Sequence, residues 1–296
     1  MNERIKNRMK GIVVAVAAAA MALTPISGCS KRGDQTEGDK RYIIIKGSDT
    51  MVHLVGNWAE AFMQQNPGIE VLATGGGSET GIAALLNGTT DICAASRRMN
   101  DKELMVVIQK NIRRHEIEVA KDGIAVIVNA ANPVSELTIE QLGEIFTGAS
   151  PRWSDVGGPD EQIVVTSREP SSGTYVLFQE MVLKKHDYMQ DAKLLPATST
   201  IIQSVSTVKW AIGYVGLGYA LAAGDEVKIV AVKANDKSLA IAPSDKTVRS
   251  GEYPIARPLY FYLNGEPKGK VKEFVDFCLS AEGQTIVTDT GYVAIR

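Results

Sequence analysis

Two periods of apolar and polar residues alternate along most of the chain, and they predict a succession of strands and helices. Short β-branched runs are typical of buried strands, whereas apolar residues three and four positions apart are typical of amphipathic helices. The helix expected over residues 51–65 shows the second pattern, with Val55, Trp58, Ala59 and Phe62 on one face. Asn66-Pro67-Gly68 is expected to end that helix,.

The other elements follow from the same two periods. Strands are expected at residues 42–45, 70–73, 91–95, 123–129, 163–165, 212–219, 227–232 and 258–263. Further helices are expected at residues 82–86, 101–112, 138–146 (with Thr138 as its cap), 175–184, 201–207 and 268–279. Such alternation implies an α/β fold with a mostly parallel sheet, in which ligands gather at the carboxyl ends of the strands.

One local design, a strand followed by a small-residue turn and a helix start, occurs three times. Its three turns are Gly47-Ser48-Asp49-Thr50, residues 75–81 and Ser172-Gly173-Thr174. A helix start leaves backbone N–H groups without internal partners and carries a positive partial charge. Each turn is therefore a potential anion-binding site.

The third turn carries additional anion-binding chemistry. Arg168 precedes it and offers a planar fork of N–H donors suited to an oxyanion,. Gly173 allows close approach of the backbone, and the hydroxyls of Ser172 and Thr174 add rotatable donors. Ser and Thr at one helix start are usually ordinary caps, so the argument depends on the repetition. Another arginine, Arg97, follows the strand at residues 91–95.

The first 29 residues are typical of a targeting segment. Basic residues precede an Ala/Val-rich run at residues 11–23, which is too short for a committed membrane span,. Pro25-Ile26-Ser27-Gly28-Cys29 resembles a bacterial lipobox, in which Cys29 would be the lipid-attachment site; an ordinary signal peptide with an incidental cysteine is the alternative. The polar residues 30–40 are expected to form a flexible tether.

Composition limits the classes of partner. The formal net charge is −2, so nothing indicates a nucleic-acid partner, and any attraction for an anion must be local,. Roughly 255 residues after the tether are enough for one large or two medium domains. Besides Cys29, the chain has Cys93 and Cys278, which we expect to be buried free thiols, although export would permit a disulfide,.

Enzyme signatures are missing from the sequence. His53, His115 and His186 lack metal-ligand spacing and fit surface roles, so no metal site is expected. The chain contains no Gly-x-Ser-x-Gly elbow, no P-loop and no dinucleotide fingerprint,. We therefore expect no catalytic residues and no cofactor; a hydrolase and a signalling or structural lipoprotein are the alternatives.

Taken in order, these motifs resemble the phosphate-binding proteins of bacterial phosphate ABC transporters, from residue 41 to the end. The resemblance implies a two-lobed periplasmic-binding-protein-like fold, each lobe a mixed sheet flanked by helices, with a two-crossover hinge. Lobe I would comprise residues 41–124 and 257–296, and lobe II residues 125–256. The crossovers would lie near residues 123–129 and 255–262, where the sequence has strands that are apolar throughout.

The resemblance also implies a phosphate site. Its expected residues are Ser48, Asp49, Thr50, Met51, Ser78, Ser96, Arg97, Arg168, Ser172, Gly173 and Thr174. Well-known members of the family have an Asp at the position of Arg97, and that Asp accepts the proton of hydrogen phosphate. Arg97 cannot accept a hydrogen bond, so this chain matches a second branch of the family. Asp49, Glu79 and Glu169 are the candidate acceptors, with Asp49 preferred; a helix-capping Asp is the alternative.

The implied function is high-affinity binding of inorganic phosphate outside the cytoplasmic membrane and its delivery to a transporter. The partners would be the permease subunits of that transporter, since the chain carries no nucleotide-binding motif. A lipid-anchored monomer on the periplasmic or extracellular face of the membrane is expected. Another tetrahedral oxyanion, such as sulfate, arsenate or molybdate, is the alternative ligand.

Overall fold

A computed structural model describes residues 42–295, whose strands form a ten-stranded sheet. Its strands are β1 (Tyr42–Gly47), β2 (Glu70–Thr74), β3 (Ile92–Ala95), β4 (Arg114–Asn129), β5 (Glu136–Thr138), β6 (Val164–Arg168), β7 (Lys193–Leu195), β8 (Ala211–Gly216), β9 (Val227–Lys233) and β10 (Ala256–Asn264). The signal-peptide and tether predictions, including Cys29, lie outside the described residues.

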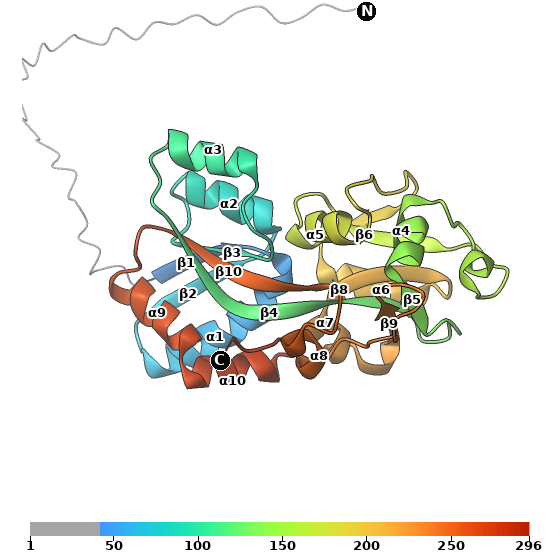
Figure 1. The fold of residues 1–296 in the computed structure, drawn as a ribbon. Helices are drawn as coiled ribbons and strands as arrows, with labels where there is room; N and C mark the ends of the chain where they lie inside the picture. The colour runs from blue at the N-terminus through green and yellow to red at the C-terminus, as the bar shows by residue number, and fades with distance from the viewer. Residues whose placement is uncertain (1–41, 296) are drawn as a thin grey trace, which may run out of the picture. The chain divides into compact units, whose positions relative to one another are not determined.

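Helices alternate with these strands through most of the described chain (Figure 1). They are α1 (Val52–Gln65), α2 (Ser78–Leu86), α3 (Asp101–Gln109), α4 (Ile139–Thr147), α5 (Gly173–Met181), α6 (Thr198–Thr207), α7 (Leu217–Ala222), α8 (Asp245–Ser250), α9 (Gly269–Leu279) and α10 (Ala281–Asp289). Short 3-10 turns are η1 (Asp49–Met51), η2 (Trp153–Val156) and η3 (Gly224–Glu226).

The sheet is mixed, in the order β2-β1-β3-β10-β4-β8-β6-β7, with β9 paired to β4 and β5. Parallel pairs join β1 to β2 and β3, and β6 to β7 and β8. The two long strands, β4 and β10, are antiparallel to each other and lie between these parallel groups. The expectation of a mostly parallel sheet is therefore correct at the two ends and wrong in the middle.

Strand β4 is longer than predicted and explains how the sheet is assembled. It begins at Arg114, whereas a strand was expected only from residue 123. Its first part, up to Gly123, pairs with β10. Its second part, from Ile124 onward, lies between β8 and β9. One strand thus passes from the β1–β3 group to the β6–β9 group (Figure 1).

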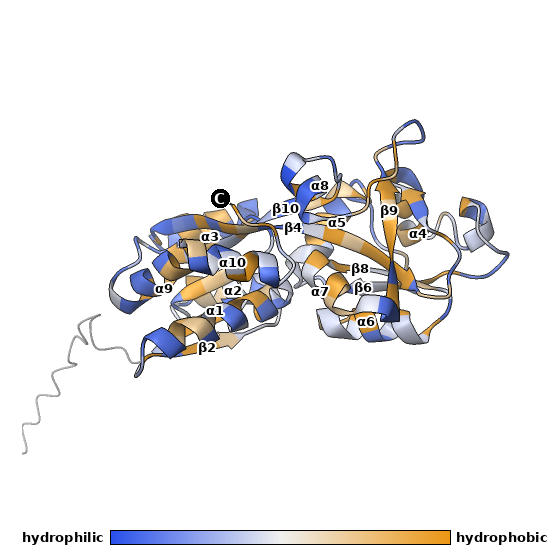
Figure 2. Ribbon diagram, turned by 90° about the horizontal axis from the view of Figure 1, so that it is seen from below, coloured by the Kyte–Doolittle hydropathy of each residue, from blue (hydrophilic) through white to orange (hydrophobic). Residues whose placement is uncertain are grey.

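Side chains alternate across β4 and build a core on each face. Ile124, Val126 and Val128 pack into a cluster with residues of α4 and α5, whereas Ala125 and Ile127 pack into a cluster with residues of α6 and α7. This is the expected period of two for a strand covered on both faces. Figure 2 shows the hydrophobic residues concentrated along such strands, most clearly on β9.

The β1–β3 group has two cores of its own. Ile92 and Ala94 of β3 face residues of α1, α9 and α10, and Cys93 and Ala95 face residues of α2 and α3. Figure 1 shows these two sets of helices on opposite sides of the strands. Cys93 and Cys278 are both buried and free, as predicted. Desolvation raises the pKa of both thiols, which keeps them protonated,.

Several helices confirm the sequence patterns and others correct them. The predicted apolar face of α1 is buried. Thr138 caps α4, since its Oγ1 accepts from the Gln141 amide at 3.1 Å. The strand expected over 212–219 stops at Gly216, and α7 begins there. Helices α8 and α10 were not predicted. No helix within residues 42–295 is long and apolar enough to cross a bilayer.

Candidate anion-binding site

The three predicted strand–turn–helix junctions converge at one place in the structure. Thr50, in η1 after β1, and Thr174, in the first turn of α5, have their hydroxyl oxygens 2.9 Å apart. Ser78, at the start of α2, lies 3.2 Å from the hydroxyl of Ser96, which follows β3. We call the side chains of Thr50, Ser78, Ser96 and Thr174 the hydroxyl cluster. All four are buried.

Gly173 joins the two pairs of the hydroxyl cluster. A Cβ at this position would lie 2.4 Å from the Ser78 hydroxyl oxygen and 2.7 Å from that of Ser96. Both distances are shorter than any real contact, so only glycine allows α5 to start this close to α2. The helix start of α5 therefore lies directly against Ser78 and Ser96, which come from the β1–β3 group.

The backbone beside Gly173 also brings the starts of α2 and α5 into contact. The Glu79 amide donates to the Ser171 carbonyl oxygen at 3.2 Å, which links the start of α2 to the loop before α5. Gly77 has φ +109°, and a Cβ there would lie 2.5 Å from the same carbonyl oxygen. The two helix starts are thus in contact. Helix N-termini carry a positive partial charge, so both favour an anion at this place.

Ser172 and Ser78 have different local roles. The Ser172 hydroxyl accepts from the Thr174 amide at 3.2 Å and is therefore the N-cap of α5. The Ser78 hydroxyl accepts from the Ser96 amide at 3.0 Å, which fixes the end of β3 to the start of α2. Ser48 is also buried, and Met51 is part of the core beneath η1.

Arg168 ends β6 and is 2% exposed. Its Nη1 donates to the Thr198 hydroxyl at 2.8 Å, and its Nη2 donates to the Pro196 carbonyl oxygen at 2.7 Å. Its Nε is buried and has no hydrogen-bond partner. Burial lowers the pKa of this guanidinium, and the neighbouring Asp49 carboxylate opposes the effect,. An unsatisfied buried N–H is costly, and an oxyanion would satisfy it.

Asp49 contacts the partners of Arg168. Its Oδ2 accepts from the Thr198 amide at 2.7 Å and from the Thr198 hydroxyl at 2.8 Å, at the start of α6. The same oxygen lies 3.3 Å from Arg168 Nη1. The carboxylate therefore caps a helix other than the one that follows it and orients Arg168. Its role as acceptor of a ligand proton stays a prediction.

Arg97 is held by a carboxylate of its own. Its two Nη atoms each lie 2.8 Å from an oxygen of Glu103, in the first turn of α3. This bidentate geometry is the strongest that the pair can adopt. Arg97 is buried beside the site, and its Nε has no hydrogen-bond partner. Its expected role in phosphate binding stays a prediction.

Two charged residues beside the hydroxyl cluster were not predicted from the sequence. Arg257, at the start of β10, donates from Nη2 to the Thr174 hydroxyl at 3.0 Å. Asp122, in β4, accepts from Arg257 at 2.9 Å. Each residue is a charge next to an apolar strand, a pattern that surface residues share, and Asp122 directly follows a second charge, Lys121. Both residues lie in or next to the segments predicted to be crossovers. A charge at such an apolar segment was the available sign of a functional residue.

Among the described residues, no group of three or more His, Cys, Asp or Glu side chains could hold a metal ion. His53 stacks on Tyr219 with ring centroids 4.3 Å apart, and His115 pairs with Glu266 at 3.2 Å. Neither histidine contacts the hydroxyl cluster through these interactions. The polar groups that converge at the cluster are hydroxyls, backbone amides and the Arg257 guanidinium, all of which can donate hydrogen bonds, together with the Asp122 carboxylate that pairs with Arg257.

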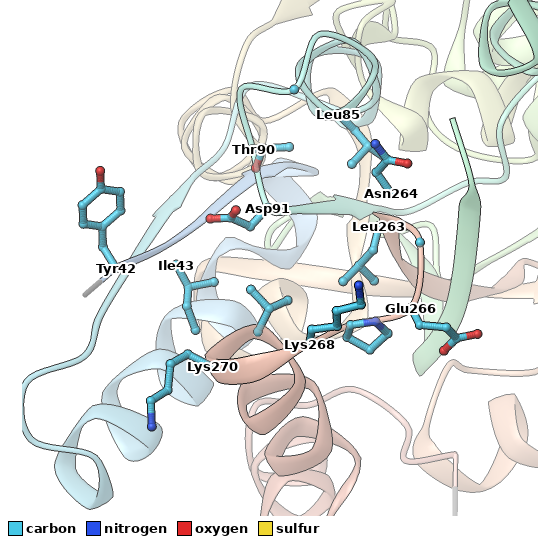
Figure 3. Close-up of a pocket in the computed structure, with 14 residues that line it drawn as sticks. Tyr42, Ile43, Leu85, Thr90, Asp91, Leu263, Asn264, Glu266, Lys268 and Lys270 are labelled. Atoms are coloured by element: carbon cyan, nitrogen blue, oxygen red, sulfur yellow. The ribbon is translucent and has the colours of Figure 1, made fainter. Parts of the chain in front are cut away.

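A separate pocket lies at the other end of the β1 and β3 strands (Figure 3). It is lined by residues from the starts of these strands and from the turn after β10, including Tyr42, Thr90, Asp91, Leu263 and Lys268. None of the predicted anion-binding residues lines it. The predicted site follows the carboxyl ends of the strands instead, as the rule for parallel α/β sheets requires.

Comparison with known proteins identifies the family. Residues 34–282 match the model of the PBP superfamily domain. The phosphate-binding protein PstS of Pseudomonas aeruginosa PAO1 is 30% identical over 300 residues, covering 96% of this chain and 92% of that protein. The chain belongs to the PstS family of phosphate-binding proteins. PstS of Staphylococcus haemolyticus is 33% identical over 255 residues, covering 84% of this chain and 79% of that protein.

Solved structures of PstS-family members have the same fold. One is a Clostridium perfringens protein described as a substrate-binding protein of a phosphate ABC transporter, with phosphate bound. It is 32% identical, with a TM-score of 0.77, and the alignment covers 86% of this chain and all of that chain. A phosphate transport receptor from Vibrio cholerae is 29% identical, with a TM-score of 0.68, over 85% of this chain and 99% of that one. The predicted periplasmic-binding-protein-like fold and family are confirmed; the exact lobe boundaries stay a prediction.

Proposed function

We propose that this chain binds inorganic phosphate outside the cytoplasmic membrane and delivers it to the permease subunits of an ABC transporter. The hydroxyl cluster supports this function because its four members come from two groups of strands, Thr50, Ser78 and Ser96 from the β1–β3 group and Thr174 from the β6–β9 group. The observation that carries the proposal is the Nε of Arg168, which is buried and has no hydrogen-bond partner. A buried donor of this kind is expected where a ligand supplies the acceptor.

The donors fit a tetrahedral oxyanion. Thr50, Ser78 and Ser96 would contribute from the β1–β3 group, and Arg168, Ser172 and Thr174 from the β6–β9 group. The starts of α2 and α5 add backbone N–H groups and the positive ends of their dipoles. A site that only binds its ligand needs no nucleophile, metal or cofactor. The protein would therefore be a binding protein and not an enzyme.

Binding would be coupled to closure of two lobes, with residues 41–124 and 257–296 in one and residues 125–256 in the other. An anion that contacts donors of both lobes stabilises the closed state over the open one by the difference in its affinity for them. The 2.9 Å contact between Thr50 and Thr174 supports this coupling, because the two residues would belong to different lobes.

Anchoring and delivery complete the proposal. Lipid attachment at Cys29, with residues 30–40 as a tether, would hold a monomer at the periplasmic or extracellular face of the membrane. Such an anchor would keep the binding domain near its permease, and the proposed tether would allow the domain to reorient. The acylated cysteine would be the only anchor required, because a lipoprotein cysteine carries more than one acyl chain.

Sulfate is the second candidate ligand, and a specific observation favours it. Asp49 and Asp122, two carboxylates near the hydroxyl cluster, each contact a guanidinium group. A carboxylate that is paired in this way repels a fully ionised sulfate less than a free one would.

Calorimetric titration tests the proposal directly. The tag-free protein would be unfolded, dialysed and refolded to remove any copurified anion, and then titrated with phosphate, sulfate and arsenate. Saturable phosphate binding at one site, with weaker binding of sulfate, is expected. Binding of sulfate alone would replace phosphate as the ligand, and binding of none of the three would refute the proposed function.

A further inference from the structure

Arg257 contacts two of the strand–turn–helix junctions of the predicted site and the end of β3. Its Nη2 lies 3.0 Å from the hydroxyl oxygen of Thr174 and 3.5 Å from that of Thr50, and these two oxygens are 2.9 Å apart. Its Nη1 donates to the Ser96 carbonyl oxygen at 3.1 Å. Arg257 Nη2, Thr50 Oγ1 and Thr174 Oγ1 thus form a compact triangle of groups able to donate a hydrogen bond. The residue is 3% exposed.

Asp122 fixes the position of this guanidinium. Asp122 and Arg257 lie opposite each other on β4 and β10, and Asp122 Oδ2 accepts from Nε at 3.2 Å and from Nη2 at 2.9 Å. The other carboxylate oxygen, Oδ1, accepts from the Leu217 amide at 3.1 Å, at the start of α7. Asp122 is 0% exposed. Burial raises its pKa, and the Arg257 charge opposes that effect.

The second arginine changes the electrostatics of the site. Arg257 and Arg168 are close enough for the charge of Arg257 to contribute to the lowered pKa of Arg168, although burial is the main cause. Two buried positive charges repel each other, and an anion bound between them would remove that repulsion. Each arginine also has one carboxylate partner, Asp49 for Arg168 and Asp122 for Arg257.

We propose that Arg257 is an anion-binding residue of this site and that Asp122 is the residue that positions it. One oxygen of the anion would accept hydrogen bonds from Arg257 Nη2 and from the hydroxyls of Thr50 and Thr174. The guanidinium can serve both partners because of its fork of N–H groups. Nε and one N–H of Nη2 donate to Asp122, and the second N–H of Nη2 is directed to the ligand. This inference rests on the proposed phosphate-binding function and adds a residue from the crossover strand β10 to it.

The test separates ligand binding from a purely structural ion pair. Arg257→Gln combined with Asp122→Asn keeps two neutral hydrogen-bonding side chains and leaves no buried charge unpaired. Phosphate affinity of this double variant should fall roughly tenfold to a hundredfold, the usual effect of losing a charge-assisted hydrogen bond. Arg98→Gln is the matched control, because that side chain is 73% exposed. It should bind phosphate as the wild type does.

Asp122→Asn alone should change the phosphate-induced rise in Tm in the direction opposite to the double variant. The substituted amide oxygen can still accept from Arg257 and hold its position, but the counter-charge is lost, so the phosphate-induced rise in Tm should be larger than in the wild type at the same phosphate concentration. In the double variant the rise should be smaller. If both variants show the wild-type rise and affinity, Arg257 does not contact the anion and the inference is overturned, while the proposed function stands. If the wild type binds no phosphate, the proposed function itself fails.

Discussion

Truncation of Arg168 is the sharpest test of the site. The side chain is 2% exposed, and its Nε is the donor that an oxyanion would satisfy. At about 4 Å and an effective dielectric constant of about 20, a unit charge on the anion would interact with the guanidinium by about 4 kcal/mol. Removing one member of a buried charge pair costs about 3–5 kcal/mol for the same reason. We expect Arg168→Ala to weaken phosphate binding by roughly 10²- to 10⁴-fold.

The stability of the free protein must be measured alongside. Arg168→Ala also loses the hydrogen bonds to Thr198 and Pro196, which should lower the free energy of unfolding by about 1–3 kcal/mol,. Combining it with Asp49→Asn removes the carboxylate left without its partner and should recover part of the stability but none of the phosphate affinity. Arg168→Lys should recover only part of the affinity, because Lys lacks the fork.

Calorimetry on the single and double variants, with unfolding curves in the absence of phosphate, measures both quantities. Arg152→Ala is a suitable control, since Arg152 pairs with Asp160 and its side chain is 46% exposed. Wild-type phosphate affinity in Arg168→Ala, with only the stability reduced, would refute the assignment of Arg168 to the ligand.

Three other predictions follow from the same site and from the leader. Small-angle scattering should show compaction on addition of phosphate, and Ser172→Ala with Thr174→Ala should abolish it; compaction that persists would separate closure from these donors. If Asp49 accepts the proton of phosphate, Asp49→Asn should reduce the preference for phosphate over sulfate. An equal loss of affinity for both anions would instead show that Asp49 acts only as a partner of Arg168. Cys29→Ser should release a folded protein from the membrane fraction, and continued sedimentation with membranes would contradict the lipobox interpretation.

The sequence predicts the local parts of this fold well because each signal lies within one short segment. The apolar face of α1 and the Thr138 cap of α4 depend only on residues three or four positions apart. The three strand–turn–helix junctions are equally local, and the structure brings them together at the hydroxyl cluster. Their convergence was predicted from the rule that parallel strands present their carboxyl ends at one edge.

Features that depend on pairing between distant segments were missed. The first part of β4 does alternate polar and apolar residues, as Glu116-Ile117-Glu118-Val119, but this short local pattern was not recognised as a strand. Asp122 and Arg257 are 135 positions apart, and nothing in either segment shows that they meet. Their pairing exists only after β4 and β10 align, with Asp122 opposite Arg257. One local pair was also missed, since the sequence pattern did not identify Glu103 as the partner of Arg97.

The pairing of β4 with β10 has a mechanical consequence. The first part of β4 and β10 form an antiparallel ladder within the β1–β3 group, and at its end the Ile124 amide donates to the Ile255 carbonyl oxygen at 2.8 Å. A ladder held by cross-strand hydrogen bonds resists shear, because sliding by one residue would turn each side chain to the opposite face. The two segments that continue from this ladder toward the β6–β9 group therefore leave it from fixed, neighbouring positions. A movement of that group relative to the β1–β3 group would be a rotation about this pair of positions, with little translation of one half past the other.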